Sequence, residues 1–457
     1  MSVDLFQDPL FGLFARERPV ATMAQLALRH LLDAAALRQV FADRAQSQRE
    51  AVIPFAALTQ MLADVVLCQQ PSVHAAFKKW RRQLGASAQA VYGKLQRVET
   101  ATSRGLVQYA FARVAAVQQA LGVRRPPDLA GYTTRILDGN HLAATDHRLK
   151  ETRASTAAPL PGKTLVVYSP ADEAVVDCFP LEDGHAQERS ALDAVLETVR
   201  ERQLWVADRN FCTNKFLAGL AAAGAAFVIR QHGQLHGQPQ GQPRRVGATA
   251  SGEVFEQPFH IPLDDGRVLK LRRVVVRLHQ PTRDGDRELL LLTNLPEDVA
   301  DAVAVAEQYR LRWRIETVLQ RLTEVLRCEI KPLCYPKAAL FGFALALVLY
   351  NALTVVLAAI AAAHGVATSA GLSHYYLALE IAQASDGLLV ALPGCWAAVA
   401  DWSPATLAQV LRQLAQGLEP SAYAKSQRGP KKPKPKPKHV RRNVHVSTKK
   451  LLDQRKQ

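Results

Sequence analysis

The sequence predicts an α/β protein in which one central sheet is flanked by helical regions. Between residues 132 and 230, short runs of apolar and β-branched residues alternate with segments of helical periodicity. Two of these runs stop at an aspartate, Asp138 and Asp208. Before and after, in residues 1–130 and 336–420, apolar residues recur every three or four positions, as in helices. A chain of 457 residues is long enough to bury a sizeable core around such a sheet.

The positive charge is concentrated at the C-terminus. The whole chain carries +16, and residues 421–457 hold thirteen Lys and Arg against a single acid, Asp453. This stretch is rich in Pro and Lys and cannot build a core, so we expect a disordered tail that binds phosphate non-specifically. A tail that only improves solubility is the alternative. The rest of the chain is only mildly basic.

Cysteine usage fits a cytoplasmic protein. The six cysteines are scattered and form no CxxC pair, so neither a zinc site nor a disulfide framework is predicted. The N-terminus lacks the basic-then-apolar order of a signal peptide. Residues 338–363 are almost wholly apolar, and Asn351 and Thr354 interrupt them. We expect a buried core helix there, with a membrane-spanning helix as the alternative.

The N-terminal region, residues 1–130, is predicted to be helical and to contact DNA. Residues 21–42 and 54–68 have helical spacing, and residues 72–84 and 88–99 flank a short Gly-containing break in the manner of a helix-turn-helix. An ordinary helical hairpin with a solvated basic face is the alternative. The first helix of the pair carries Lys78, Lys79, Arg81 and Arg82, and the second carries Tyr92, Lys94 and Arg97.

The middle of the chain predicts the strand and helix order β-β-β-α-β-α-β. Asp138 and Asp208 follow the first and fourth strands, where rigid backbone can hold a ligand in place. The predicted strands are residues 132–137, 164–168, 174–179, 204–207 and 226–230, and the predicted helices are residues 188–203 and 213–223, with Thr213 as the cap of the second.

A further helix is predicted over residues 309–323, which contain no Gly or Pro. Tyr309, Arg312 and Glu316 stand at i, i+3 and i+7 and therefore share one face, with Trp313 beside them. A carboxylate for a metal, a guanidinium for phosphate and aromatic rings for a base suit a phosphodiester. The alternative is a purely structural helix with the same residue pattern, which buries its aromatic rings and holds Glu316 in a salt bridge.

The Tyr-x2-Arg-x3-Glu pattern of this helix resembles the Tyr-Arg-Glu-Lys signature of the DDE transposases of bacterial insertion sequences, in the IS-four family. Thr323 stands where the signature has its lysine. Residues that could take over the role of the lysine are Arg321, Arg327 and Lys331.

Two upstream runs carry the same resemblance. DGNH begins at Asp138 and DRNF begins at Asp208, and both are similar to the runs around the family's first and second aspartates. The resemblance covers about residues 130–350 and implies a ribonuclease-H-like fold in which the first and fourth strands are neighbours. It also implies that Asp138, Asp208 and Glu316 are the catalytic triad and bind two Mg²⁺ ions, for which Mn²⁺ can substitute.

Other acids in this region compete for the same role. Asp146 is expected in a loop, and the side chain of Asp177 is expected to point away from the site. His141 is expected either to touch DNA or to serve as a structural hydrogen-bonding group. The remaining competitors are Asp172 and Asp193.

The stretch between the second aspartate and the glutamate is too long for one helix and one strand, and it resembles the β-rich insertion of the same family. We expect a loop over residues 232–250 and strands over residues 254–261, 268–278 and 288–293. Members that cut through a DNA hairpin carry a stacking aromatic residue near the position of Leu289, where this chain has no Trp or Tyr. The cleavage route therefore stays open.

The resemblance implies a DNA transposase that cleaves the ends of its element and joins the 3′-hydroxyl to target DNA. Its partners would be double-stranded DNA, at the element ends and the target, and a second copy of the chain in a homodimer. A ribonuclease-H-like nuclease without joining activity and a domesticated DNA-binding protein are the alternatives. The expected DNA-binding residues are Tyr309, Arg312, Trp313, Arg209, Lys78, Lys79, Arg81 and Arg82. The expected divisions are 1–130, 131–232, 233–297, 298–335, 336–420 and 421–457, and the expected location is the nucleoid in the cytoplasm.

Overall fold

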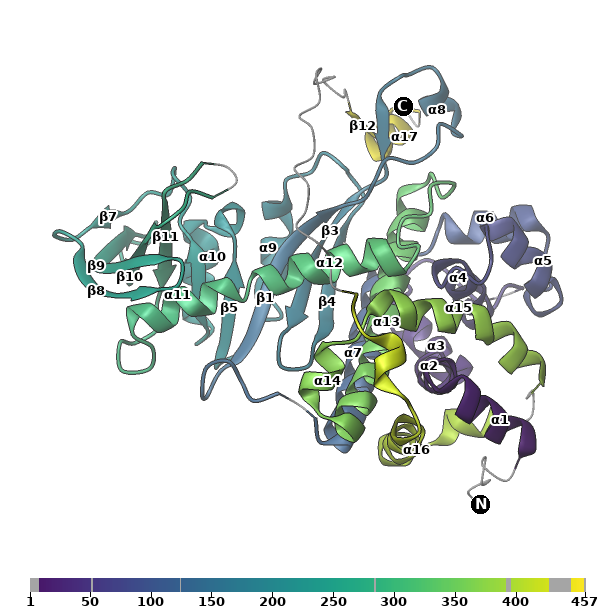
Figure 1. Cartoon of the computed structure of the whole chain (residues 1–457). Coiled ribbons are helices and arrows are strands. Elements are labelled where there is room, and N and C mark those ends of the chain that lie inside the picture. The colour runs from purple at the N-terminus through teal and green to yellow at the C-terminus, as the bar shows by residue number, and fades with distance from the viewer. Residues whose placement is uncertain are drawn as a thin grey trace.

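A mixed ten-stranded sheet runs through the middle of the protein, with helical layers on both faces (Figure 1). The β-rich end and the N-terminal helices lie at opposite ends of the molecule, and α12 crosses the front of the sheet between them (Figure 1). The structure, a computed structural model, describes residues 8–50, 52–123, 125–282, 285–391, 396–426 and 445–455.

The half of the sheet that carries Asp138 and Asp208 has the strand order β4-β3-β1-β5-β6. β1 pairs in parallel with β5, and Leu137 lies opposite Ala207. This confirms that the first and fourth predicted strands are neighbours. All five predicted strands are present, as β1 (Thr133–His141), β3 (Lys163–Ser169), β4 (Ala174–Leu181), β5 (Gln203–Ala207) and β6 (Ala226–Arg230).

The β-rich stretch continues this sheet instead of forming a separate one. β11 pairs antiparallel with β6, with Leu292 opposite Ile229, and β10 and β9 follow outward. Part of the stretch predicted as loop also forms strands, because its backbone pairs with the long β9. The strands are β7 (Gln238–Pro239), β8 (Arg244–Thr249), β9 (Gly252–Pro262), β10 (Val268–Leu278) and β11 (Glu288–Thr293).

Two hydrophobic cores lie on opposite faces of the sheet. Leu137 belongs to the core beneath α9 (Leu192–Leu196) and α10 (Asn214–Ala222). Ile136, the preceding residue, belongs to the larger core on the other face, as the alternation of a strand requires. The helix predicted over residues 188–203 is wrong in length. Only η2 (Glu188–Ala191) and α9 form, because Arg202 takes a positive φ of 57° and turns the chain into β5.

The N-terminal region is helical, as predicted, but one predicted helix is split. Asp33 accepts a hydrogen bond from the backbone N–H of Ala36 and starts a new helix within residues 21–42. Ser72 and Ser87 cap the two helices of the basic pair, and Gly85 between them takes a φ of 58°. The helices are α1 (Pro9–Glu17), α2 (Pro19–Leu31), α3 (Ala34–Arg44), α4 (Phe55–Val66), α5 (Val73–Leu84), α6 (Ala88–Leu95) and α7 (Thr100–Leu121), the last of which the sequence reading did not identify.

The apolar segment forms α13 (Pro336–His364), the central helix of the larger core. In the part of the chain that the structure describes, it is the one helix apolar and long enough to cross a membrane, and 89% of its most apolar window is buried inside the protein. Its polar interruptions have partners. Asn351 is fully buried and exchanges two hydrogen bonds with the backbone of Val175 on the edge strand β4. The segment is therefore a core helix, as predicted.

After α13, the chain forms α14 (Val366–Ala370), α15 (His374–Ala391) and α16 (Pro404–Gln416). The predicted basic tail departs from expectation at its end. β12 (His445–Ser447) pairs in parallel with β2 (Ala158–Leu160), and α17 (Thr448–Gln454) packs beside α8 (Lys150–Arg153). The prediction of disorder is wrong for this segment, because backbone pairing fixes it on the sheet domain. The Pro/Lys-rich stretch 427–444 lies outside the described residues.

Candidate active site

Asp138 and Asp208 lie side by side on neighbouring strands. The paired residues Leu137 and Ala207 directly precede them, so the two backbones are roughly 5 Å apart at this point. Asp138 lies inside β1, which continues to His141, and not beyond its end as the sequence reading expected. The strand continues because β3 still pairs with it there, whereas β5 has ended. Ile136 and Asp138 share a face, which turns the carboxylate toward α12.

The helix predicted over residues 309–323 is in fact two helices, α11 (Ala302–Arg310) and α12 (Trp313–Val325). At the break, the backbone N–H groups of Leu311 and Arg312 bond to carbonyls three residues back, as in a 3₁₀ turn. The backbone dihedral angles of Leu311 and Arg312 stay helical, so the break needs no Gly or Pro. No residue type in the sequence therefore marks it. Arg312 is thereby placed at the start of α12, facing the sheet.

Arg312 forms ion pairs with acids on two elements, Asp138 on β1 and Glu316 on α12. Its Nη2 lies 2.6 Å from Oε1 of Glu316, and its Nη1 lies 3.5 Å from Oδ2 of Asp138. The side chain of Arg312 is 12% exposed, against 43% for Glu316. The structure therefore brings Asp138, Arg312 and Glu316 together as predicted, with Asp208 on the adjoining strand.

Burial sets the protonation of Asp138. The pKa of this carboxyl is raised from 3.8 to about 7, chiefly by burial and to a smaller extent by the negative charges of Asp208 and Glu316. The Arg312 guanidinium and the backbone N–H of Gly139 act in the opposite direction and are outweighed. A cation placed beside this carboxyl would favour its ionised form and lower its pKa.

The aromatic neighbours of Arg312 differ in exposure. Tyr309 is 6% exposed and belongs to the core, and the guanidinium lies 6.0 Å from its ring centroid. Trp313 is 58% exposed and its ring lies 5.1 Å from the same guanidinium. Trp313 can therefore meet a ligand, whereas Tyr309 holds Arg312. Within the described residues, Nε of Arg312 is buried and has no hydrogen-bond partner.

Sequence reasoning missed Glu188. Its side chain is 12% exposed, accepts a hydrogen bond from Nδ2 of Asn210 and lies 3.7 Å from Nδ1 of His141. A Cβ on Gly139 would meet this carboxylate at 2.3 Å, so a larger residue there would require the Glu188 side chain to shift. Glu188 therefore connects the run after Asp138 with the run after Asp208. The glycine of the first run and the asparagine of the second were the available signals.

The competing aspartates are engaged elsewhere. Asp177 accepts two hydrogen bonds from Arg104 and one from Gln108, and it is buried. Asp172 accepts a hydrogen bond from the hydroxyl of Ser169. The other two form exposed ion pairs, Asp146 with Arg148 and Asp193 with Lys215.

The three candidates for the missing lysine are placed differently. Arg321 lies beside Tyr350 in a small pocket behind α12. Arg327 donates to the backbone carbonyls of Gln70 and Pro71 and so ties α12 to the N-terminal region. Lys331 is exposed. The hydroxyl of Thr323 donates to the carbonyl of Gln320 and stays on its own helix.

The predicted DNA-binding residues outside α12 are spread over two surfaces. Arg209 is 48% exposed and stands directly after Asp208. On α5, Lys79 forms an ion pair with Asp64 at 3.0 Å, which anchors the helix to α4. Lys78, Arg81 and Arg82 are exposed.

The donor set of the site suits a hard divalent cation. Carboxylate oxygens are the ligands that Mg²⁺ prefers, and a cation beside the half-buried Asp138 would favour its ionised form, whose pKa burial raises. Arg312 supplies part of that charge in the arrangement described. Across the described residues, however, no three His, Cys, Asp or Glu side chains stand close enough to hold one ion as they are. The three acids therefore suit a divalent cation by their chemistry, and the side chains of Asp138, Asp208 and Glu316 would have to move closer together to bind it.

Residues 130–352 match a family model described as a transposase DDE domain, over just under half of the chain. No curated protein matches the chain. The matched segment contains Asp138, Asp208 and Glu316 and the strands and helices that carry them. The mixed sheet with its helical layers is consistent with such a domain. The match supports a DDE transposase, an enzyme that acts on DNA.

Proposed function

We propose that this chain is a DNA transposase that cleaves the ends of its insertion sequence and joins the freed 3′-hydroxyl to target DNA. The observation that supports it most is the meeting of Asp138 with Arg312 and Glu316, beside Asp208 on the adjoining strand. The strand order β4-β3-β1-β5-β6 supports a ribonuclease-H-like catalytic domain. Membership of the IS-four family and a homodimer on DNA belong to the same proposal.

Asp138, Asp208 and Glu316 would hold Mg²⁺, with two ions expected and Mn²⁺ able to substitute. The bound ions would stabilise charge on the attacking and leaving oxygens of a phosphate. Arg312 would then break its ion pair with either Asp138 or Glu316 and bind a phosphate of the substrate instead. Its unpartnered Nε and the planar fork of the guanidinium suit two phosphate oxygens. The exposed ring of Trp313 would pack on a sugar or base, and Tyr309 would position Arg312.

One site serves both steps of this reaction. Water attacks the phosphate at the element end first, and the 3′-hydroxyl that this step releases attacks target DNA second. In both steps the acids would hold the metal ions, and Arg312 would hold the phosphate in line with the attacking oxygen. Arg209, next to Asp208 and half exposed, is placed to contact the strand that runs past the site.

Single replacement of Asp138, Asp208 or Glu316 by Ala should abolish cleavage and leave DNA binding largely intact. The matched control is Asp146→Ala, which removes an exposed acid paired with Arg148 in the same domain and should cut normally. Full activity in one of the three variants would remove that residue from the site. Cleavage by the wild type without any joined product would favour a nuclease instead.

A further inference from the structure

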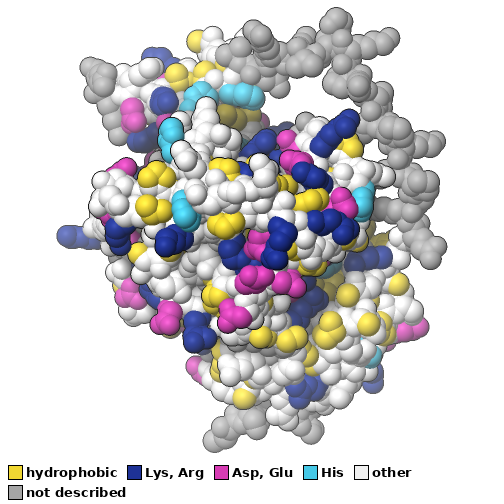
Figure 2. Space-filling view, turned by 90° about the vertical axis from the view of Figure 1, so that its left-hand side faces the viewer, with side chains coloured by type: hydrophobic (Ala, Val, Ile, Leu, Met, Phe, Trp, Pro, Cys, Tyr) yellow, Lys and Arg dark blue, Asp and Glu magenta, His cyan; other side chains and the backbone are white. Residues whose placement is uncertain are grey.

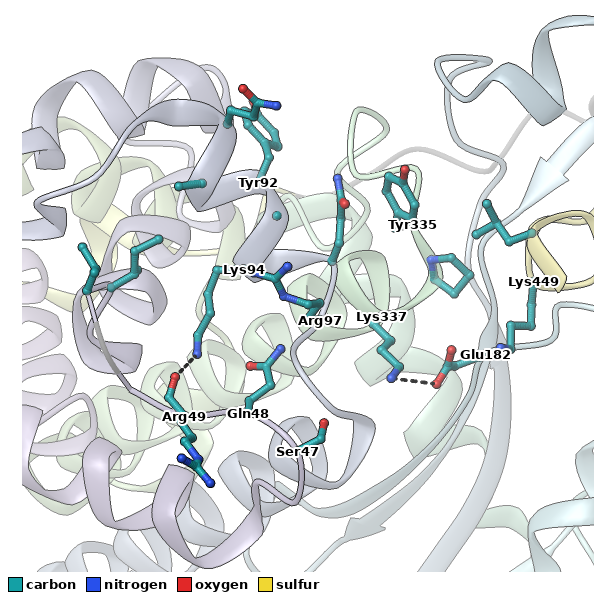
Figure 3. A pocket seen from close by; sticks show the side chains of 18 of the residues that line it. Ser47, Gln48, Arg49, Tyr92, Lys94, Arg97, Glu182, Tyr335, Lys337 and Lys449 are labelled. Carbon is teal, nitrogen blue, oxygen red and sulfur yellow. Dashed lines mark hydrogen bonds and ion pairs between the residues drawn. The ribbon is translucent and has the colours of Figure 1, made fainter. Parts of the chain in front are cut away.

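A large cleft lies between the N-terminal helices and the sheet domain. Its volume is about 1280 Å³. One wall is made by residues 47–49 and 52–53 and by α6, and the other by the start of α13, the residue after β4 and α17 (Figure 3). Segments from the beginning, the middle and the end of the sequence therefore meet around it.

Positive side chains dominate both walls. Figure 3 shows Arg97 on the α6 side with Lys337 and Lys449 on the opposite side. Arg49 and Arg97 are exposed, and the described residues offer neither of them an ion pair. Among the described residues, Lys337 has one ion pair, a long contact of 3.9 Å with Glu182. The complete set of charged lining residues is Arg49, Lys94, Arg97, Lys337, Lys449 and Arg455, against Glu182 and Asp453.

This concentration differs from the face formed by the β-rich end. On the face formed by the β-rich end, Lys and Arg are interspersed with Asp and Glu and form no continuous patch (Figure 2). The six cations outnumber the two acids of the lining, and an anion in the cleft would offset the repulsion among the cations that remain unpaired. Tyr92 and Tyr335 face the cleft from opposite walls, so flat rings accompany the cations (Figure 3). Cations combined with aromatic rings suit a nucleic acid strand.

The C-terminal segment 445–455 is held in place as part of the wall. β12 pairs with β2, Lys450 lies 3.3 Å from Asp183, and Arg455 lies 2.9 Å from Glu151. These contacts place Lys449 on the cleft, where it forms an ion pair at 3.1 Å with Asp453 of its own helix.

Glu182, which lines the cleft, lies at the same end and face of the sheet as Asp138. His141 of β1 pairs with Lys163 of β3, which pairs with Leu181 of β4, and Glu182 follows. Leu181 packs on the core under α9 and α10, so Glu182 points to the other face, as Asp138 does. Two strand spacings and four residues separate Asp138 from Glu182, which is about 16 Å. That distance corresponds to roughly four or five nucleotides along a DNA strand.

We propose that this cleft binds the sugar-phosphate backbone of the DNA that flanks the phosphate being cut, with Arg49, Arg97 and Lys449 as its phosphate contacts. The proposal rests on the proposed function and adds a second binding surface for the DNA substrate. The C-terminal segment is then a fixed wall of the DNA site, and α6 is the helix of the basic pair that meets DNA.

The test is the salt dependence of binding to a 40-base-pair duplex of random sequence. Each lost phosphate contact lowers the slope of log K against log [salt] by about 0.9. Arg49→Gln with Arg97→Gln should therefore lower the slope by about 2 and weaken binding about 30-fold at 0.15 M salt. Adding Lys449→Gln should lower the slope by about one more. Both arginines are exposed, so the melting temperature should stay unchanged.

The matched control is Arg16→Gln with Arg38→Gln, which removes the same charge from exposed positions on α1 and α3 outside the cleft. This control should bind nearly as the wild type does. Equal slopes for the cleft and control variants would overturn the cleft assignment and leave the proposed function standing. A wild type that does not bind the duplex at all would contradict the proposed function itself.

Discussion

Replacement of Asp138 by asparagine should stabilise the metal-free protein at neutral pH although it destroys catalysis. Folding raises the pKa of this carboxyl from 3.8 to about 7, chiefly by burial. Between these values the unfolded chain is ionised there and the folded protein is not, so the free energy of unfolding falls as pH rises from about 4 to about 7. At pH 8 this increase in pKa lowers the free energy of unfolding by about 4 kcal/mol. Asparagine has the shape of the acid without its charge and avoids this loss.

Thermal unfolding of both proteins without metal, at pH 4.5 and pH 8, measures the effect. At pH 8 the variant should melt several degrees above the wild type, and at pH 4.5 the two should nearly coincide. Burial lowers the pKa of His30 to about 4 and of His374 to about 3, which destabilises both proteins alike in acid. The difference between the two proteins therefore isolates Asp138. A variant no more stable than the wild type at pH 8 would show that Arg312 already compensates the charge.

Three further predictions follow from the contacts of the site. Arg312→Lys should retain some cleavage and Arg312→Ala very little, since Lys cannot grip two oxygens; an Arg312→Ala protein that melts early yet still cuts at low temperature would assign the residue to stability alone. Gly139→Ala should lower cleavage because its Cβ meets the Glu188 carboxylate and the clash shifts β1 beside Asp138, and adding Glu188→Ala should remove the clash and restore part of the cleavage; no rescue would mean that the clash does not disturb β1. Truncation after about residue 420 should weaken binding to all DNA alike and flatten its salt dependence, whereas loss of preference for element ends only would make the tail a sequence reader.

The sheet was predictable because its strands are short apolar runs bounded by turns. Each predicted strand from residue 132 to residue 230 is present, and β10 and β11 have the predicted bounds. The adjacency of Asp138 and Asp208 came from the resemblance and is confirmed by the pairing of β1 with β5. Register between distant strands cannot be read from local pattern, which is why the continuation of the sheet into β9–β11 was not foreseen.

The misses have a common physical origin in contacts between distant segments. The break at Leu311 uses ordinary helical angles, so no residue type marks it. Glu188 lies far along the chain from Asp138 and reaches the site only because η2 packs against η3 (Arg209–Phe211). The C-terminal segment reads as tail by composition, yet three residues of strand pairing fix it. Tyr309 was expected on DNA and is instead buried beside Arg312.

The central claim is that the site joins DNA, with Asp138, Asp208 and Glu316 as its metal-binding acids. The direct measurement is strand transfer with Mg²⁺, in which a duplex carrying the element end, already cut to expose its 3′-hydroxyl, is mixed with plasmid DNA. The wild type should convert both into a covalently joined product, and each of the three alanine variants should bind the duplex without joining it. Joining that survives the loss of any one acid, or nicking of the plasmid without joined product, would contradict the account.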